Sequence, residues 1–232
     1  MISETRFARG YSSFWRSAAP TMELYVKRCN LDGYERNFEP IQSVVHPDRR
    51  AITNQIAFEI FSIIVSHNIS NNEIDIEAYH PDNVSEAVRV LNAGLINLTK
   101  EEINEASLLA KRMWLHFAYP HRLMVNTKPK FKGCGIILTC LGDVLVDDDI
   151  IVEFKDGDRP FRSYEFRQLS VYSALYYREY RRLPKAIGVL NSRRGTYIQI
   201  EFAEFVKEIS GRSSLDYVHE IIQMITETTI TQ

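Results

Sequence analysis

The chain of 232 residues is 45% hydrophobic, which is enough for one large domain or for a core with an extension. Its formal net charge of −2 argues against a uniformly basic surface that binds nucleic acid indiscriminately. We expect a cytoplasmic protein without a membrane segment, because no apolar stretch reaches the length of a span and the first residues lack the apolar centre of a signal peptide. The three cysteines (Cys29, Cys134 and Cys140) show no disulfide or metal-ligand spacing, which argues against zinc.

The first 98 residues are predicted to form a mostly helical extension packed on the core. The predicted helices span residues 10–30, 53–67 and 84–97. Apolar residues recur at helical spacing in the second of these helices. Pro20 is expected to break the first helix, and Ser85 is expected to cap the third, which should end near Gly94.

A helix start signal opens the predicted core at Thr99. The segment from Thr99 to Glu102 matches a capping box, in which the hydroxyl and the carboxylate bond reciprocally to backbone N–H groups. The helix is expected to end near Phe117, because Pro120 cannot continue it.

The core, predicted for residues 99–205, combines strands with helices. Runs rich in β-branched and aromatic residues predict strands at 122–127, 136–141, 150–155, 186–190 and 196–202. A helix is predicted over 163–180, and a C-terminal helix within 206–232 is expected to be capped by Ser213 or Ser214. The order helix, three strands, helix, two strands indicates an α/β fold with a mixed central sheet flanked by helices.

Three charged residues accompany the middle strands of this core. Glu153 and Lys155 are two residues apart and therefore lie on one face of the strand at 150–155. A turn at 147–149 is expected to return the chain so that Asp143 lies beside Glu153. Two carboxylates can hold a hard divalent cation that activates a water, and an ammonium group can orient that water. Taken alone, the same residues also fit an exposed hairpin with a solvated acidic tip.

The order of these residues resembles the motif of the PD-(D/E)XK nuclease superfamily, in its RecB-like branch. In that superfamily an acid is followed by E-x-K on the next strand and by a helix with Q-x-x-x-Y. The matching residues are Asp143, Glu153-Phe154-Lys155, Gln168 and Tyr172. The resemblance extends from Arg122 to Phe202, and Gly142 stands where the name of the superfamily has proline.

The resemblance implies a restriction-endonuclease-like core that uses Mg²⁺ or Mn²⁺. The implied catalytic residues are Asp143, Glu153, Lys155, Gln168 and Tyr172. The implied metal ligands are Asp143, Glu153, Phe154 and Glu105. Glu105 is included because the helix before the first core strand often supplies a further acid in such enzymes; its alternative is a solvated position on the helix surface.

Positive charge is concentrated directly after the predicted metal site. Residues 155–194 contain ten Lys or Arg and four Asp or Glu. A phosphate backbone is expected to lie where such a local surplus adjoins the site. The predicted phosphate contacts are Arg162, Arg167, Arg193 and Arg194, because they lie near the motif elements. Arg178, Arg181 and Arg182 of the run also fit an ordinary solvated face.

Two hypotheses about function follow from the sequence. The first is a metal-dependent nuclease that hydrolyses phosphodiester bonds in DNA, in repair or in defence against foreign DNA. The second is a nuclease-fold subunit that serves mainly in binding or assembly within a larger complex. RNA remains open as a substrate, because no feature reads the 2′-hydroxyl. We expect a protein partner or self-association, and no nucleotide cofactor, because the sequence has no P-loop.

Overall fold

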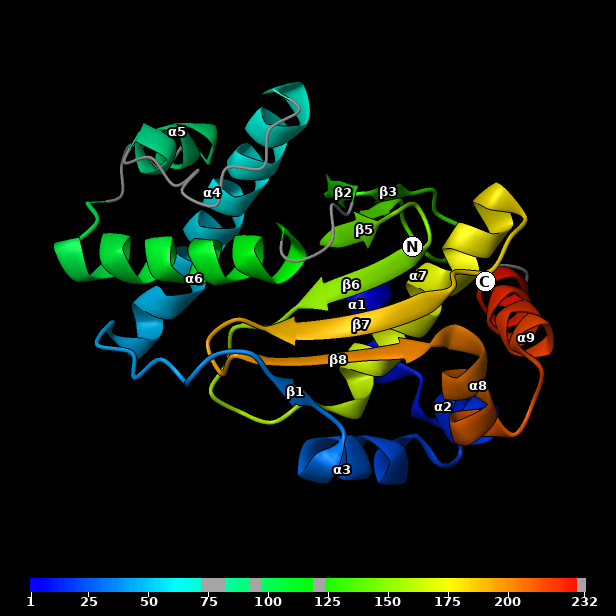
Figure 1. Cartoon of the computed structure of the whole chain (residues 1–232). Coiled ribbons are helices and arrows are strands. Elements are labelled where there is room, and N and C mark those ends of the chain that lie inside the picture. The colour runs from blue at the N-terminus through cyan, green and yellow to red at the C-terminus, as the bar shows by residue number, and fades with distance from the viewer. Residues whose placement is uncertain (72–81, 92–96, 119–123, 229–232) are drawn as a thin grey trace. The chain divides into compact units, whose positions relative to one another are not determined.

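The structure, a computed structural model, describes residues 1–71, 82–91, 97–118 and 124–228 (Figure 1). Contacts within the chain divide it into two compact units. Unit 1 consists of Met1–Glu35, Asn126–Leu190 and Tyr197–Gln232, and unit 2 consists of Arg36–Val125 and Asn191–Thr196. The helices before Glu35 fall in unit 1, and the helix that follows Thr99 falls in unit 2.

The helices are α1 (Glu4–Gly10), α2 (Ser12–Ala18), α3 (Met22–Asp32), η1 (Pro47–Arg49), α4 (Arg50–Asn71), α5 (Asp82–Val90), α6 (Lys100–Ala118), α7 (Ser163–Tyr180), α8 (Phe202–Ser210) and α9 (Ser214–Glu227). The strands are β1 (Glu35–Arg36), β2 (Val125–Thr127), β3 (Lys130–Phe131), β4 (Cys140–Leu141), β5 (Val144–Val146), β6 (Ile150–Phe154), β7 (Ala186–Asn191) and β8 (Thr196–Glu201). Among the described helices, none is both long and apolar enough to cross a membrane.

A mixed six-stranded sheet is the centre of the fold. Its strand order is β1-β8-β7-β6-β5-β2, and β3 and β4 form a separate two-stranded sheet. Strands β5 and β6 are antiparallel, whereas β6 and β7 are parallel. A parallel pair needs a crossover connection, and α7 supplies it between β6 and β7. The predicted α/β class with a mixed sheet flanked by helices is confirmed.

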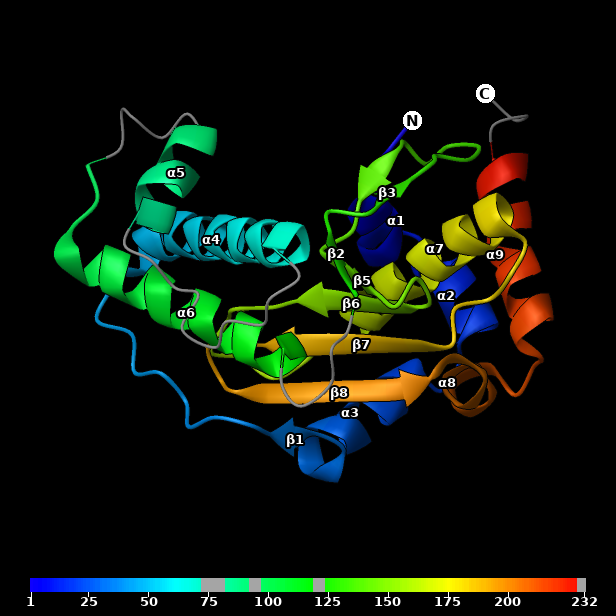
Figure 2. The same ribbon diagram turned by 45° about the horizontal axis from the view of Figure 1, so that its top comes forward.

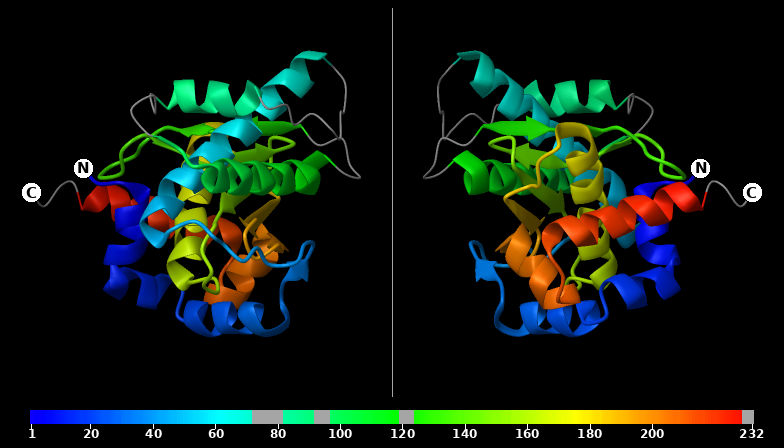
Figure 3. Two further views of the ribbon diagram at one scale, coloured as in Figure 1. Left: turned by 90° about the vertical axis from the view of Figure 1, so that its left-hand side faces the viewer. Right: turned by 90° about the vertical axis from the view of Figure 1, so that its right-hand side faces the viewer.

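Helix α7 joins one face of the sheet to the other helices of unit 1. It packs against β6, α1 and α9. Helix α1 lies behind β6 and β7 in Figure 1 and beside α7 in Figure 2. Leu145, Ile151 and Val189 from alternate strand positions share a hydrophobic cluster with Leu169 and Leu175 of α7. Helix α9 packs beside α2, as Figure 3 shows. This face of β5 and β6 is therefore the one that looks toward α7.

Unit 2 is built mainly from α4 and α6, which pack on each other, with α5 and η1 against α4. The predicted capping box of α6 is confirmed: the Thr99 N–H donates to Glu102 Oε2 at 2.9 Å, and the Glu102 N–H donates to Thr99 Oγ1 at 3.2 Å. Apolar side chains of both long helices are buried, including Ile60 and Phe61 of α4 and Leu109 of α6.

The strand predictions before residue 150 need correction. Only Cys140 and Leu141 of the expected strand at 136–141 are in a strand, and β5 was missed. Gly135 adopts a positive φ of 54°, and Cys134 and Ile137 form only an isolated bridge. The β-forming residues of this segment therefore find no continuous partner, and strand formation depends on that pairing. Residues 122–123 of the first expected strand lie outside the described residues.

Several predicted helices are present, but the limits of some of them differ from those expected. The expected helix at 10–30 is three helices, of which α1 begins at Glu4. Ser85 lies inside α5 and does not cap it, because that helix begins at Asp82, and the expected end near residue 94 lies outside the described residues. Phe202 begins α8, which was missed. The helix at 163–180 and the Ser213 cap of α9 are confirmed.

Candidate functional site

The β5–β6 hairpin brings Asp143 and Glu153 together. Val144 pairs with Val152 across the antiparallel ladder, so the next residues outward, Asp143 and Glu153, lie opposite each other. Glu153 is two residues beyond Ile151 and points to the face covered by α7. The predicted hairpin return is thus confirmed by the strand register.

The turn of this hairpin is held by α7. Asp147 and Asp148 both have positive φ, 48° and 58°, which aspartate tolerates better than β-branched residues do. The Asp148 carbonyl accepts hydrogen bonds from Tyr176 Oη at 2.5 Å and Arg182 Nη2 at 2.8 Å. The acidic turn therefore positions the two strands, in addition to presenting exposed side chains at Asp147 and Asp148.

The two carboxylates differ in their hydrogen bonds. Asp143 Oδ2 accepts from the Phe154 N–H at 2.6 Å. Glu153 Oε1 binds Lys155 Nζ at 2.5 Å, and Glu153 Oε2 is buried without a hydrogen-bond partner. The Glu153 side chain is 6% exposed and that of Lys155 is 21% exposed. A buried carboxylate oxygen without a partner is costly, and it marks the point where a further positive group would fit.

The charges of the site are not balanced. Burial raises the pKa of Glu153 to about 8, and the charge of Asp143 adds to that rise. Burial also raises the pKa of Asp143, although Lys155 and the Phe154 N–H oppose it. Burial alone would lower the pKa of Lys155, but Glu153 and Asp143 outweigh it, so the pKa is raised and the ammonium stays charged. One cation thus faces two carboxylates, and a proton or a metal ion can bind there.

Gln168 and Tyr172 of α7 connect this hairpin to α1. Gln168 Nε2 donates to Tyr172 Oη at 3.0 Å and to Thr5 Oγ1 at 3.2 Å. Tyr172 Oη donates to the Leu141 carbonyl at 3.3 Å, and its pKa is raised, first by burial and then by the charge of Glu153. The two residues are one helical turn apart, as the sequence predicts, and the structure places both beside the hairpin.

Glu4 of α1 is a site residue that the sequence interpretation missed. Its Oε1 accepts from Gln168 Nε2 and from Tyr172 Oη, each at 3.4 Å, and its charge contributes to the raised pKa of Glu153. A signal was present, because Ser3 caps α1 by accepting from the Arg6 N–H at 3.2 Å. The expected start of the first helix at residue 10 hid that signal.

Glu105 occupies a different environment from the one predicted. It lies in unit 2, where its Oε1 accepts from Arg193 Nη1 at 2.7 Å and from Ser43 Oγ at 3.0 Å. Arg193 is 1% exposed and also donates to Asn54 Oδ1 at 2.9 Å. Glu105 and Arg193 therefore form a buried ion pair within unit 2, and each already has a partner there.

The other predicted phosphate contacts also differ in availability. Arg167 is paired with Glu23 at 2.9 Å and its side chain is 14% exposed. Arg194 belongs to unit 2 and is half-buried. Arg162 is exposed at the N-cap of α7. Of the four predicted arginines, only Arg162 presents an open side chain.

The residues of the hairpin fit a divalent cation. Among the described residues, no group of three or more His, Cys, Asp and Glu side chains is spaced to hold a metal ion. Asp143 and Glu153 would therefore hold the cation as a pair, with the unpartnered Glu153 Oε2 as the clearest vacant ligand. Phe154 has only its backbone carbonyl to offer. A site of this kind suits Mg²⁺, which keeps several waters and needs few carboxylates.

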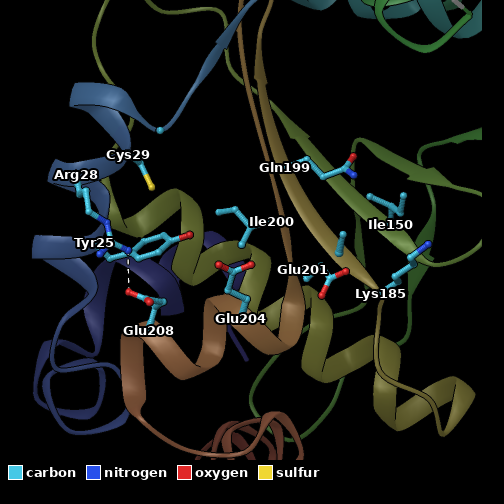
Figure 4. Close-up of a pocket in the computed structure, with 12 residues that line it drawn as sticks. Tyr25, Arg28, Cys29, Ile150, Lys185, Gln199, Ile200, Glu201, Glu204 and Glu208 are labelled. Atoms are coloured by element: carbon cyan, nitrogen blue, oxygen red, sulfur yellow. Dashed lines mark hydrogen bonds and ion pairs between the residues drawn. The ribbon is translucent and has the colours of Figure 1, made fainter. Parts of the chain in front are cut away.

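A pocket of about 580 Å³ in unit 1 lies elsewhere (Figure 4). It is lined by α3, α8 and strand ends, with Glu201, Glu204 and Glu208 along one wall. Ile150 at the start of β6 lines it, whereas Glu153 near the end of that strand does not. Its acidic wall would repel phosphate, so the pocket does not extend the carboxylate site.

The arrangement supports hydrolysis of a charged ester. It combines a carboxylate pair, a charged Lys155 and a tyrosine–amide pair around one strand end. A bound cation and a fixed ammonium group can stabilise the negative charge that grows on a phosphoryl oxygen in the transition state. No family model and no curated protein matches the chain, so its interpretation rests on the geometry of this site.

Proposed function

We propose that the protein is a metal-dependent nuclease of the PD-(D/E)XK superfamily, in its RecB-like branch, and that it hydrolyses phosphodiester bonds in DNA. The observation that carries this proposal is the pairing of Asp143 with Glu153 across the β5–β6 hairpin, with Lys155 bound to Glu153 at 2.5 Å. The motif order alone is compatible with an exposed hairpin, but an exposed hairpin would leave its carboxylates solvated. Glu153 is 5% exposed, which favours the proposal.

Each residue of the site then has a distinct role. Bound Mg²⁺ or Mn²⁺ would polarise the phosphate and lower the pKa of a water. Asp143 and Glu153 would hold the cation, and the Phe154 N–H orients the Asp143 carboxylate through its 2.6 Å hydrogen bond. Lys155, held by Glu153, orients the attacking water and offsets negative charge that grows on the phosphoryl oxygens.

Gln168, Tyr172 and Glu4 position the reacting groups from the helical side. Gln168 donates to Tyr172, and both donate to Glu4 Oε1 at 3.4 Å. This network fixes the side chains nearest the carboxylate pair, which matters because small displacements of reacting groups reduce rates strongly. Tyr172 remains protonated, since its raised pKa keeps the hydroxyl neutral, and it acts as a hydrogen-bond donor.

The cellular role belongs to the same proposal. A nuclease of this type would serve in repair or in defence against foreign DNA. The net charge of −2 favours help from a partner protein or from self-association in holding DNA. Co-purification of the tagged chain from its own cells would identify that partner.

The test is a cleavage assay with a matched control. Plasmid, linear duplex, single-stranded DNA and RNA are incubated with the protein, with and without Mg²⁺ or Mn²⁺. We expect metal-dependent cleavage of DNA that is lost in Lys155→Ala and retained in Lys207→Ala, which changes an exposed lysine of α8. Absence of cleavage, with wild type and Lys155→Ala indistinguishable, would reject the nuclease and support a binding or assembly subunit. Cleavage of RNA alone would identify RNA, and not DNA, as the substrate.

A further inference from the structure

Helix α1 runs from the carboxylate site to the start of α7. Its first residues, Glu4 and Thr5, contact Gln168 and Tyr172, which lie in the middle of α7. Its last turn reaches Tyr164 in the first turn of α7, where the guanidinium carbon of Arg9 lies 4.3 Å from the ring centre. The two helices are thus antiparallel, and α1 changes from acidic at the site to basic one turn away.

Several arginines meet around Tyr164. Arg159 lies 5.4 Å from the same ring centre, donates to Tyr164 Oη and pairs with Glu165 at 2.7 Å. Arg162, two residues before Tyr164, is exposed. Arg159 is thereby occupied by a buried carboxylate, whereas Arg9, which lies over the ring, and Arg162, which precedes Tyr164 by two residues, have exposed side chains.

Arg6 extends this positive surface toward the site. It is exposed and lies three residues before Arg9, so both are on the same side of α1. Five residues separate Glu4 from Arg9, which corresponds to about 8 Å along a helix. A nucleic acid strand advances about 3.4 Å per nucleotide, so along α1 Arg9 lies two or three nucleotide steps from Glu4 and Arg6 lies about one step from it.

The acids near this surface already have partners within the chain, and of these Glu23 keeps an exposed side chain. Glu23 binds Ser163 Oγ at 2.5 Å and Arg167 Nη2 at 2.9 Å. Glu165 is fully buried and paired with Arg159. Asp156 and Asp158 in the preceding loop carry negative charge, but both already have interactions. The exposed charge contributed by α1 after Glu4 and by the N-cap of α7 is positive.

We propose that Arg6, Arg9 and Arg162 form a phosphate-contact surface that holds the DNA backbone beside the carboxylate site. This inference rests on the proposed nuclease function and names the part of the chain that binds its substrate. Arginines contact phosphate oxygens without regard to base, so this surface supplies affinity and orientation and no sequence preference. These three arginines are proposed as phosphate contacts in place of Arg167 and Arg193, whose guanidinium groups are bound within the protein.

The experiment measures DNA binding without cleavage. A fluorescent duplex is titrated by anisotropy in EDTA, over a range of salt concentrations, with wild type and with the triple variant Arg6→Gln/Arg9→Gln/Arg162→Gln. Each lost phosphate contact lowers the slope of log affinity against log salt by about 0.9, so the slope should fall by about 2–3. Affinity in low salt should fall by about 10²-fold, and the two proteins should converge in high salt.

Two further variants separate this surface from net charge and from folding. Arg16→Gln/Arg181→Gln/Lys207→Gln removes three exposed cations elsewhere in unit 1 and should leave the slope near that of wild type. Arg6→Lys/Arg9→Lys/Arg162→Lys keeps the charge and should restore most of the slope. Equal slopes for the two Gln variants would overturn the inference, while cleavage by wild type would leave the nuclease proposal intact. Failure of wild type both to bind and to cleave DNA would overturn both.

Discussion

Two buried acid–cation pairs in this chain differ in how many of their polar atoms have hydrogen-bond partners. In unit 2, Arg193 binds Glu105 at 2.7 Å, and Ser43 and Asn54 take up further hydrogen bonds of the pair. In unit 1, Lys155 binds Glu153 at 2.5 Å, yet a second oxygen of Glu153 has no partner.

The difference lies in the number of carboxylates. Glu105 accepts from one guanidinium group and from the Ser43 hydroxyl, whereas Lys155 meets the charges of Glu153 and Asp143 together. A buried pair with all its hydrogen bonds is a structural element whose loss destabilises the fold. A buried pair with surplus negative charge has pKa values shifted from normal, which is the pattern expected of a functional site. Burial alone therefore does not distinguish these two sites, but charge balance does.

The largest effect is expected from a substitution at the carboxylate site of unit 1. Asp143→Ala should abolish both metal binding and cleavage, because a hard cation held by two carboxylates tolerates little loss. Folding should survive or improve, since repulsion between Asp143 and Glu153 is relieved when no cation is bound. Calorimetric titration with Mg²⁺ and a cleavage assay measure the two losses. Wild-type Mg²⁺ binding by the variant would show that Asp143 is not a ligand.

Breaking the Glu105–Arg193 pair of unit 2 should lower the free energy of unfolding. Arg193→Ala leaves Glu105 buried without its cation, which costs about 3–5 kcal/mol in the free energy of unfolding. Urea denaturation followed by circular dichroism measures the change. Arg162→Ala is the matched control, because its exposed side chain should change stability by less than about 0.5 kcal/mol. Similar midpoints for the two variants would show that Arg193 is not a structural residue.

Lys155→Ala separates metal binding from catalysis. It leaves both carboxylates in place, so Mg²⁺ binding should persist or tighten. Cleavage should slow by about 10²–10³, the typical effect of removing one preorganised charged group from an active site. Single-turnover rates at saturating Mg²⁺ isolate the chemical step. A variant that loses Mg²⁺ binding as completely as Asp143→Ala would contradict this division of roles.

A pH dependence of stability is expected when no metal is bound. The pKa of Glu153 is raised from 4.5 to about 8 in the folded state, so the folded chain keeps a proton that the unfolded chain releases. Stability should therefore fall as the pH rises from about 4.5 to about 8, and Mg²⁺ should restore it at the upper end. Unfolding curves in EDTA, compared with Glu153→Gln, isolate this contribution. A wild type and variant with the same pH profile would contradict the assignment.

Local signals were sufficient for several parts of the fold. The capping box at Thr99, the helix at 163–180 and the hairpin that faces Asp143 toward Glu153 follow from neighbours in the sequence. Each depends on interactions within a few residues, such as a side chain bonding to its own helix end or alternation along a strand. The α/β class could be predicted for the same reason, because it follows from the order of such elements.

Long-range contacts decided what these signals could not. Glu4 reaches the site because α1 packs on α7, more than 160 residues later in the chain. Glu105 and Arg193 are 88 positions apart, and only their burial against each other shows that they form an ion pair. The chain by itself determined which residues can carry charge and where its helices and strands begin. The tertiary structure decided which charges meet, because a carboxylate has the same local sequence signal whether its partner is an arginine, another acid or solvent.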